Sequence, residues 1–350
     1  MNSFVSKSRF LVVGGAGFVG SNLVRTLLDK GAKEIVVIDN LLSSEKENLP
    51  QAKEIIFIQG SITDDNILSQ ISDEFDYIFH LATFHGNQNS IYDPLADHEN
   101  NTLTTLKLFN HIKDFKRIKK VVYSGAGCAV AKKGMVDNVS PVKEDEPISF
   151  EMDSPYSISK LIGEFYSVYF WRRFSLPVVR ARFQNVYGPW EVLGAGKWRG
   201  TPATVWRNVI PTFIYKALKN EPLPVENKGI ATRDFIYVED IVKGLLLCAL
   251  KGEAGDVYNL ATGRETSILE LAKLINELTG NKAGIIFLPK RDWDSSIRRI
   301  GSTLKAKEKL GFTALVDIKE GLKKTIKWTQ EHIDYIERNI SKHRPYLESC

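Results

Sequence analysis

Short apolar runs alternate with helix-length segments over the first half of the chain. The first run, Phe10 to Val13, is too short for a helix and ends in a cluster of glycines, which is typical of a buried strand followed by a turn. Residues 21–30 carry apolar side chains at helical spacing, and Gly31 is placed to end that helix before the next run, Ile35 to Ile38. Further runs lie at residues 55–58, 77–81, 121–123 and 178–182. Strands that alternate with helices predict an α/β fold with a doubly wound parallel sheet of the Rossmann type.

The pattern continues with longer helices and then loosens. Two long helices are expected at residues 97–115 and 156–174, and their exposed faces are candidates for pairing with another subunit. After Pro189, several glycines indicate a loop that reaches over a cleft. Helices are next expected at residues 210–219, 238–250 and 267–278, with a strand at 256–260. We therefore expect a Rossmann domain over residues 1–189, to which 229–262 returns, and a smaller substrate-binding lobe over most of 190–350.

Composition excludes several classes of protein. Charged residues make up 25% of the 350 and hydrophobic ones 43%, which is ordinary for a folded globular chain. The net charge is +5, but basic and acidic residues interleave, so no nucleic-acid partner is expected. No apolar run reaches the roughly 18 residues of a membrane span, and the N-terminus lacks a signal-peptide pattern. Cys128, Cys248 and Cys350 form no metal-binding spacing. A cytoplasmic enzyme without a metal is expected.

A glycine-rich turn follows the first strand and predicts a dinucleotide site. Gly14, Gly17 and Gly20 form a GxxGxxG pattern between strand and helix. Glycine is needed where the backbone approaches a pyrophosphate, and the free N–H groups at the helix start favour an anion. Phe18 and Val19, at the start of the helix, join the three glycines as predicted cofactor contacts.

Asp39 ends the second strand and indicates which dinucleotide binds. It lies about 20 residues after the glycine turn, where a carboxylate can accept hydrogen bonds from the adenosine ribose hydroxyls. A 2′-phosphate would be repelled by Asp39, and Asn40 rather than an arginine follows it. NAD is therefore favoured over NADP, while the alternative for Asp39 is an acid that merely forms a turn.

Tyr156 and Lys160 are the candidate catalytic pair. Their i, i+4 spacing places both side chains on one face of a helix. A nearby ammonium lowers the pKa of a phenol and lets the phenolate act as a base toward a hydroxyl near neutral pH.

Together with these motifs, five segments make the chain resemble the extended short-chain dehydrogenase/reductase family, and especially its nucleotide-sugar epimerases and dehydratases. The resemblance extends to about Trp328. The matching segments are Asp39–Leu41, His80–Ala82, Asn100–Asn101, Arg182–Pro189 and Arg233–Asp240.

The resemblance implies NAD as cofactor, a nucleotide-diphosphate sugar as substrate, and a homodimer or higher homo-oligomer built on the two long helices. It also implies roles for residues at matching positions. Ser61 and Ile62 would flank the adenine, Leu81, Ala82 and Thr83 would line the dinucleotide, Asn101 would support the nicotinamide side, Asn185 would bind the substrate diphosphate, and Arg233 with Arg298 or Arg299 would neutralise it.

One position departs from the family pattern. Ala126 stands where the family carries a serine or threonine that bonds the sugar oxygen, and Ser124 is the only nearby replacement. The 4,6-dehydratases would need an Asp-Glu pair where this chain has Gly127 and Cys128. Cys128 instead falls where GDP-mannose 3,5-epimerases place a catalytic cysteine, and residues 196–200 loosely resemble their lysine-bearing loop. The alternative for Cys128 is a buried packing residue.

The leading hypothesis is an NAD-dependent nucleotide-sugar epimerase that oxidises the hexose at C4 and reduces it again. Alternatives are a 4-dehydrogenase or ketoreductase that releases the ketosugar, and a 3,5-epimerase that uses Cys128. A 4,6-dehydratase or a non-catalytic nucleotide-binding protein is less favoured. His85 is a candidate contact to the hexose, with a structural role as its alternative.

Overall fold

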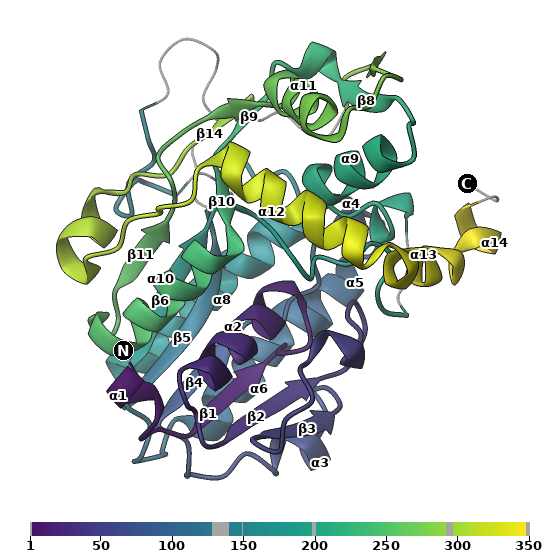
Figure 1. Cartoon of the computed structure of the whole chain (residues 1–350). Coiled ribbons are helices and arrows are strands. Elements are labelled where there is room, and N and C mark those ends of the chain that lie inside the picture. Colours follow the sequence, from purple (N-terminus) through teal and green to yellow (C-terminus); the bar gives the residue numbers. More distant parts are fainter. Residues whose placement is uncertain (1, 128–139, 149, 198–200, 292–296, 348–350) are drawn as a thin grey trace.

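A seven-stranded parallel sheet forms the centre of the molecule (Figure 1). The computed structural model describes residues 2–127, 140–148, 150–197, 201–291 and 297–347. The strand order is β11-β6-β5-β4-β1-β2-β3, and every pairing in it is parallel. The predicted fold class is therefore confirmed. The strands are β1 (Phe10–Val13), β2 (Ile35–Asp39), β3 (Ile55–Gln59), β4 (Tyr77–His80), β5 (Lys120–Ala126), β6 (Val178–Phe183) and β11 (Val257–Leu260).

Helices cover both faces of this sheet. Side chains alternate along β1, so Phe10 and Val12 enter one apolar core while Leu11 and Val13 enter the other. The first core also contains apolar side chains of α2 (Phe18–Asp29) and α10 (Val238–Lys251). The second contains those of α6 (Thr104–Ile112) and α8 (Pro155–Phe174). Burial on both faces explains why the strands read as continuous apolar runs.

The helix expected at residues 97–115 runs without a gap from Pro94 to Ile112, so it begins and ends three residues earlier than predicted and contains a π-helical turn. The structure has α5 (Pro94–Asp97), a π-helical turn η2 (His98–Leu103) and then α6, which ends at Ile112. Pro94 opens α5 because the side chain of Asp93 accepts the N–H of Ala96. The hydroxyls of Thr104 and Thr105, at the start of α6, donate to the carbonyls of Asn100 and Asn101 in η2 and compete with regular helical bonding.

A third apolar core lies under the smaller sheets, outside the central sheet. It packs α9 (Val209–Leu218), α11 (Ile268–Thr279) and α12 (Ile318–Glu331) against β8 (Leu223–Glu226). The stretch 229–262 supplies β11 and α10 to the central sheet, while the proposed domain boundaries stay a prediction. The other strands are β7 (Asn185–Tyr187), β9 (Thr232–Arg233), β10 (Phe235–Tyr237), β12 (Thr266–Ser267), β13 (Ile285–Leu288) and β14 (Arg298–Arg299).

The remaining helical elements are short, apart from one near the C-terminus. Among the residues that the structure describes, no helix combines the length and apolarity that crossing a membrane requires. The remaining helical elements are α1 (Asn2–Val5), α3 (Asp65–Leu68), α4 (Asn87–Tyr92), α13 (Ile333–Ser341), α14 (Arg344–Leu347) and the turns η1 (Lys46–Asn48), η3 (Pro202–Thr204), η4 (Asn227–Gly229) and η5 (Ala306–Leu310).

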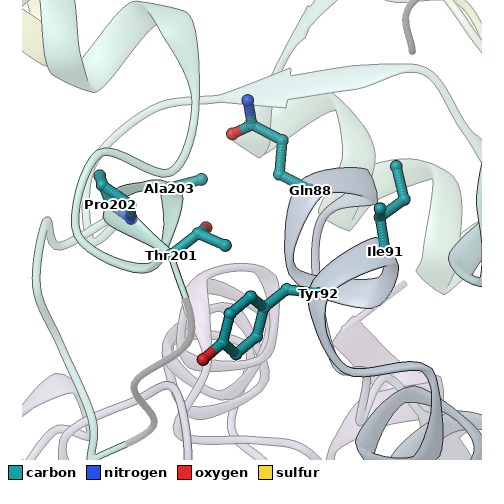
Figure 2. Close-up of a pocket in the computed structure, with 6 residues that line it drawn as sticks. All are labelled: Gln88, Ile91, Tyr92, Thr201, Pro202 and Ala203. Atoms are coloured by element: carbon teal, nitrogen blue, oxygen red, sulfur yellow. The ribbon is translucent and has the colours of Figure 1, made fainter. Parts of the chain in front are cut away.

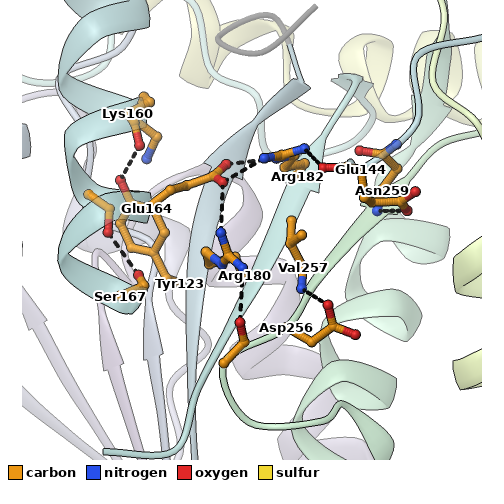
Figure 3. A network of polar contacts seen from close by, with 12 residues as sticks. Tyr123, Glu144, Lys160, Glu164, Ser167, Arg180, Arg182, Asp256, Val257 and Asn259 are labelled. Carbon is orange, nitrogen blue, oxygen red and sulfur yellow. Dashed lines mark hydrogen bonds and ion pairs between the residues drawn. The ribbon is translucent and has the colours of Figure 1, made fainter. Parts of the chain in front are cut away.

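A buried ion pair fastens α8 to the sheet (Figure 3). The Glu164 carboxylate on α8 accepts two hydrogen bonds from the Arg182 guanidinium on β6, at 2.9 and 2.8 Å. Arg180 lies 3.5 Å from the same carboxylate. The side chains of Glu164 and Arg182 are 2% and 5% exposed, so each charge depends on the other for its compensation.

We expect Glu164→Gln to lower the free energy of unfolding by about 3–5 kcal/mol, because it leaves the Arg182 charge buried without a counter-charge. Urea denaturation followed by circular dichroism measures this loss. The matched control is Glu253→Gln, which breaks an ion pair with Lys309 between side chains that are 66% and 54% exposed. That change should cost less than about 1 kcal/mol. Equal losses in the two variants would contradict the role of the buried pair.

Candidate active site

The glycine turn after β1 forms a cradle that side chains would fill. Gly14 has φ of +82°, and a Cβ there would lie 2.4 Å from the backbone nitrogen of Ala82. A Cβ on Gly20 would lie 2.2 Å from the carbonyl oxygen of Gly14. Gly17 precedes α2 without a capping side chain, and Phe18 and Val19 open the helix. The first N–H groups of α2 are therefore available to an anion, as a dinucleotide pyrophosphate requires.

Asp39 lies beside this turn at the end of β2. One carboxylate oxygen accepts the Ala16 N–H at 2.9 Å, and the other accepts the Leu41 N–H and the Ser44 hydroxyl at 2.9 and 2.8 Å. Burial raises the pKa of the Asp39 carboxyl. The carboxylate is thus tied to the glycine turn on one side and to the segment after β2 on the other. Asn40 is more exposed, and its amide donates to Asn100.

The other predicted cofactor residues gather at the same edge of the sheet. This follows from the parallel register, which sets Val13 beside His80 and Asp39 beside Gln59. Ser61 and the buried Ile62 follow β3, and Leu81, Ala82 and Thr83 follow β4.

Asn101 joins this edge to α8. Its Oδ1 accepts the Phe84 N–H at 2.7 Å and the Thr83 hydroxyl at 3.0 Å. Its Nδ2 donates to Asp97 at 2.7 Å and to the Ser159 hydroxyl at 3.2 Å. Burial raises the pKa of the Asp97 carboxyl. Asn101 thus fixes the segment after β4 relative to the helix that carries Tyr156 and Lys160.

Lys160 is held against the end of β5. The residue is 3% exposed, and its Nζ donates to the Ser124 hydroxyl at 3.3 Å. Ser124 in turn donates to the carbonyl of His80 at 3.1 Å. The Tyr123 hydroxyl donates to the carbonyl of Lys160 at 3.2 Å (Figure 3). Ser124 therefore lies at the lysine of the candidate pair.

Tyr156 lies on the same helix, among different neighbours. Its N–H donates to the Ser90 hydroxyl at 3.1 Å, and its ring meets the His85 ring edge-to-face at 5.8 Å. Ala126 packs in one small apolar cluster with Tyr156. The position that carries a hydroxyl in the family thus presents a methyl group near this ring.

His80, near the pair, is neutral at pH 7. Burial lowers the pKa of His80 to about 3, and the positive charge of Lys160 adds to this effect. His80 is fixed through Nε2 to Thr105 at 3.0 Å. His85 has the candidate tyrosine as its ring neighbour and remains a candidate contact to a sugar.

The predicted substrate arginines divide between two environments. The parallel register of β9 and β14 sets Arg299 beside Arg233 and Arg298 beside Thr232. Partners in register point to the same face, so Arg299 shares a face with the buried Arg233. Arg299 lies 3.3 Å from Asp153, whereas Arg298 pairs with Glu265. Asn185 opens β7, and its N–H donates to the carbonyl of Asp234 next to Arg233.

A cavity of about 400 Å³ lies beside α4 (Figure 2). The Thr201 hydroxyl donates to Asn89 at 2.9 Å and joins the loop to α4, which also carries Ser90. The cavity is lined by Gln88, Ile91, Tyr92, Thr201, Pro202 and Ala203.

Sequence reasoning missed two charged residues, Arg207 and Glu191, in the glycine-rich loop that follows Pro189. Arg207 donates to the carbonyls of Thr204 and Ala195, and burial lowers its pKa to about 10. Burial raises the pKa of Glu191 to about 7, although Asn208 donates to its carboxylate. Neither residue belongs to a periodic pattern, so no local feature of the sequence identifies them.

Of the three cysteines, the structure describes Cys248. Cys128 and Cys350 lie outside the described residues, as do residues 198–200 of the lysine-bearing loop. Cys248 is buried in the core of the central sheet, where burial raises the pKa of its thiol. Within the described ranges, no cluster of three potential metal ligands occurs.

Known proteins match this chain over nearly its whole length. A model of the NAD-dependent epimerase/dehydratase family matches residues 10–261, and a model named polysaccharide biosynthesis protein matches 207–320. The Bordetella bronchiseptica enzyme WbmF, solved with NAD+ and UDP, is 57% identical, with 99% of each chain covered and a TM-score of 0.88. UDP-glucose 4-epimerase of Thermotoga maritima, solved with UDP-glucose, is 32% identical, with 93% of this chain and 99% of that one covered and a TM-score of 0.82. UDP-glucuronic acid decarboxylase 1 of Xenopus tropicalis is 30% identical over 97% of this chain and 76% of its own. The predicted cofactor, NAD, is confirmed.

We expect Gly14→Ala to lower the free energy of unfolding by about 2–5 kcal/mol and to weaken NAD binding, because it combines a left-handed backbone with a collision. Gly280→Ala is the matched control, since Gly280 has φ of +71° but a Cβ added there would meet no atom within 4 Å. It should cost about 1–2 kcal/mol and leave NAD binding unchanged. Urea titration measures the stability of both variants and calorimetry measures their NAD binding. Similar losses in the two variants would contradict the claim that close backbone contact requires glycine at position 14.

The raised pKa of Glu191 predicts that the free energy of unfolding depends on pH. Its folded pKa of about 7 exceeds the ordinary 4.5, so its contribution is complete below pH 4.5 and is lost as pH rises through 7. The free energy of unfolding of the native protein, relative to that of Glu191→Gln, should fall by about 3 kcal/mol over that range. A difference that stays constant with pH in urea denaturation would show that Glu191 ionises normally.

Proposed function

This chain belongs to the NAD-dependent epimerase/dehydratase family, and we propose that it is a UDP-sugar epimerase that acts through a 4-ketosugar. The observation that carries the proposal is the pair on α8: Lys160 is buried against Ser124 at the end of β5, and Tyr156 lies one turn earlier on the same helix. When bound, NAD accepts a hydride from C4 of the hexose and returns it to the opposite face of the ketosugar.

In this proposal Tyr156 is the base that removes the proton of the C4 hydroxyl and later returns it. The Lys160 ammonium favours the phenolate, and Ser124 holds that ammonium through their 3.3 Å contact. His85, exposed and in ring contact with Tyr156, is placed to orient the hexose.

The proposed NAD contacts are the residues that meet at the carboxyl edge of the sheet. The glycine turn holds the pyrophosphate on the N-terminus of α2, and Asp39 accepts the ribose hydroxyls. The full proposed set is Gly14, Gly17, Phe18, Val19, Gly20, Asp39, Asn40, Ser61, Ile62, Leu81, Ala82, Thr83 and Asn101, with Tyr156 and Lys160.

For the substrate we propose that Arg233 and Arg299 neutralise the diphosphate and that Asn185 bonds it. Arg299 is preferred to Arg298 because it shares a face with the buried Arg233. Uridine is the proposed base because WbmF, at 57% identity, was solved with UDP.

Ala126 favours one alternative, a dehydrogenase or ketoreductase that releases the 4-ketosugar. Its methyl group stands near Tyr156 in place of the hydroxyl that bonds the sugar oxygen in the family. A weakly held ketosugar would leave before it is reduced again. The 3,5-epimerase hypothesis depends on Cys128, which lies outside the described residues.

We also propose a homodimer through the exposed side of α8. Ile158, Phe165 and Tyr169 are exposed along one face of this helix, at the spacing of a helix–helix seam. Burying such a face against a second copy would remove apolar surface from water. A cytoplasmic location stays a prediction.

The proposed function is tested by incubating the purified protein with UDP-, GDP-, CDP- and dTDP-hexoses and separating the products. We expect a UDP-hexose to yield its epimer without net NADH. Accumulation of NADH with a ketosugar would instead establish the dehydrogenase, and no conversion of any sugar would refute an enzymatic role on these substrates.

In the same assay, Tyr156→Phe should lower kcat by about 10²- to 10⁴-fold, the usual contribution of a general base. The NAD content of the protein should not change. Tyr166→Phe removes a hydroxyl from the same helix outside the candidate pair and should retain native kcat. Turnover by Tyr156→Phe at the native rate would overturn the assignment.

A further inference from the structure

Helix α13, near the C-terminus, contacts the loop that follows β2, although the two are far apart in sequence. The Tyr335 hydroxyl donates to Asn48 Oδ1 at 2.8 Å, and Lys342 Nζ donates to Glu45 at 2.8 Å. Arg338 pairs with Glu47 at the exposed margin of the same contact. Residues 41–48 therefore connect Asp39, at the proposed adenosine side of the cofactor site, to a helix near the C-terminus.

Asn48 extends this contact to the glycine turn. Its side chain is buried, and Nδ2 donates to the carbonyl of Ala16 at 3.0 Å. The N–H of Ala16 is bonded to Asp39 at 2.9 Å. Both backbone polar groups of Ala16 are thus hydrogen-bonded. Its N–H donates to Asp39, the residue predicted to bind the ribose, and its carbonyl accepts from the Asn48 amide, which is itself bonded to Tyr335 on α13.

Apolar packing and a hydrogen bond anchor α13 to the glycine-rich loop that follows Pro189. Ile336 and Ile340 pack in an apolar cluster with Val192 and Leu193 of the glycine-rich loop. His343, just after α13, contacts the carbonyl of Gly194 at 2.6 Å.

The glycine-rich loop also closes on residues 41–48 directly. The Lys197 N–H donates to the carbonyl of Leu42 at 2.9 Å, and the Gly196 N–H donates to Glu45 at 2.8 Å. A Cβ on Gly196 would lie 2.3 Å from the Leu42 carbonyl oxygen, so only glycine allows this approach. The loop after β2 is held from two sides.

We propose that Tyr335 and Asn48 are positioning residues that fix the glycine turn from α13 and so slow the dissociation of NAD. A turn held in one conformation loses less freedom when a ligand binds and must break more contacts to open. Slow release suits the proposed function, on which this inference rests, because an epimerase regenerates NAD in every turnover. The helix thereby makes NAD a retained group rather than an exchanging substrate.

The test loads the full-length protein with radiolabelled NAD and follows its exchange against excess unlabelled NAD by rapid gel filtration. Tyr335→Phe should accelerate dissociation by about three- to tenfold, as expected for one lost hydrogen bond. Asn48→Ala should act similarly. Adding Tyr335→Phe to Asn48→Ala should have no further effect, because the two residues form one chain of bonds.

Arg338→Gln is the matched control, since it breaks the exposed contact between the same helix and the same loop. It should change the dissociation rate by less than about twofold. Native dissociation in Tyr335→Phe, or equal acceleration in Arg338→Gln, would overturn the proposal. The readout is retained dinucleotide rather than product, so a protein that retains NAD through Tyr335 but converts no sugar would refute the proposed function alone.

Discussion

The close packing of α8 against β5 and β6 fixes the proposed catalytic pair, Tyr156 and Lys160, and the rest of the candidate site is arranged around it. A Cβ on Gly163 would lie 2.0 Å from the Tyr123 hydroxyl, so glycine is needed for the helix to approach the strand this closely. Glu164 then pairs with Arg182 in the interior, one turn after Lys160. Lys160 meets Ser124 because the helix is held at this depth, which places Tyr156 at the carboxyl edge of the sheet.

That edge is where a parallel sheet offers a dinucleotide its binding surface. The glycine turn, Asp39 and the segment after β4 come together there because their strands are neighbours in register. Asn101 ties this surface to α8, and α13 holds it from the other side through Asn48. The proposed cofactor retention and the proposed proton transfer thus depend on separate contacts that meet at one site.

Much of this arrangement is local and could be predicted from the sequence. The apolar runs gave the central strands, the glycine spacing gave the turn, and the i, i+4 spacing gave the shared face of Tyr156 and Lys160. The π-helical turn at His98–Leu103, the buried Glu191 and the contact between Tyr335 and Asn48 could not be predicted in the same way. The π-helical turn depends on the bonding of threonine hydroxyls to carbonyls four residues back, whereas Glu191 and the Tyr335–Asn48 contact depend on segments far apart in the chain. The choice of Arg299 over Arg298 required the register of β14.

The most direct test of the central claim follows a deuterium label placed at C4 of the UDP-hexose through one turnover. If hydride moves between C4 and the NAD held beside Tyr156, mass spectrometry of quenched samples should find the label first on the protein-bound dinucleotide. It should then appear at C4 of the product. Loss of the label to solvent, or an epimer formed while the dinucleotide never carries deuterium, would contradict the account.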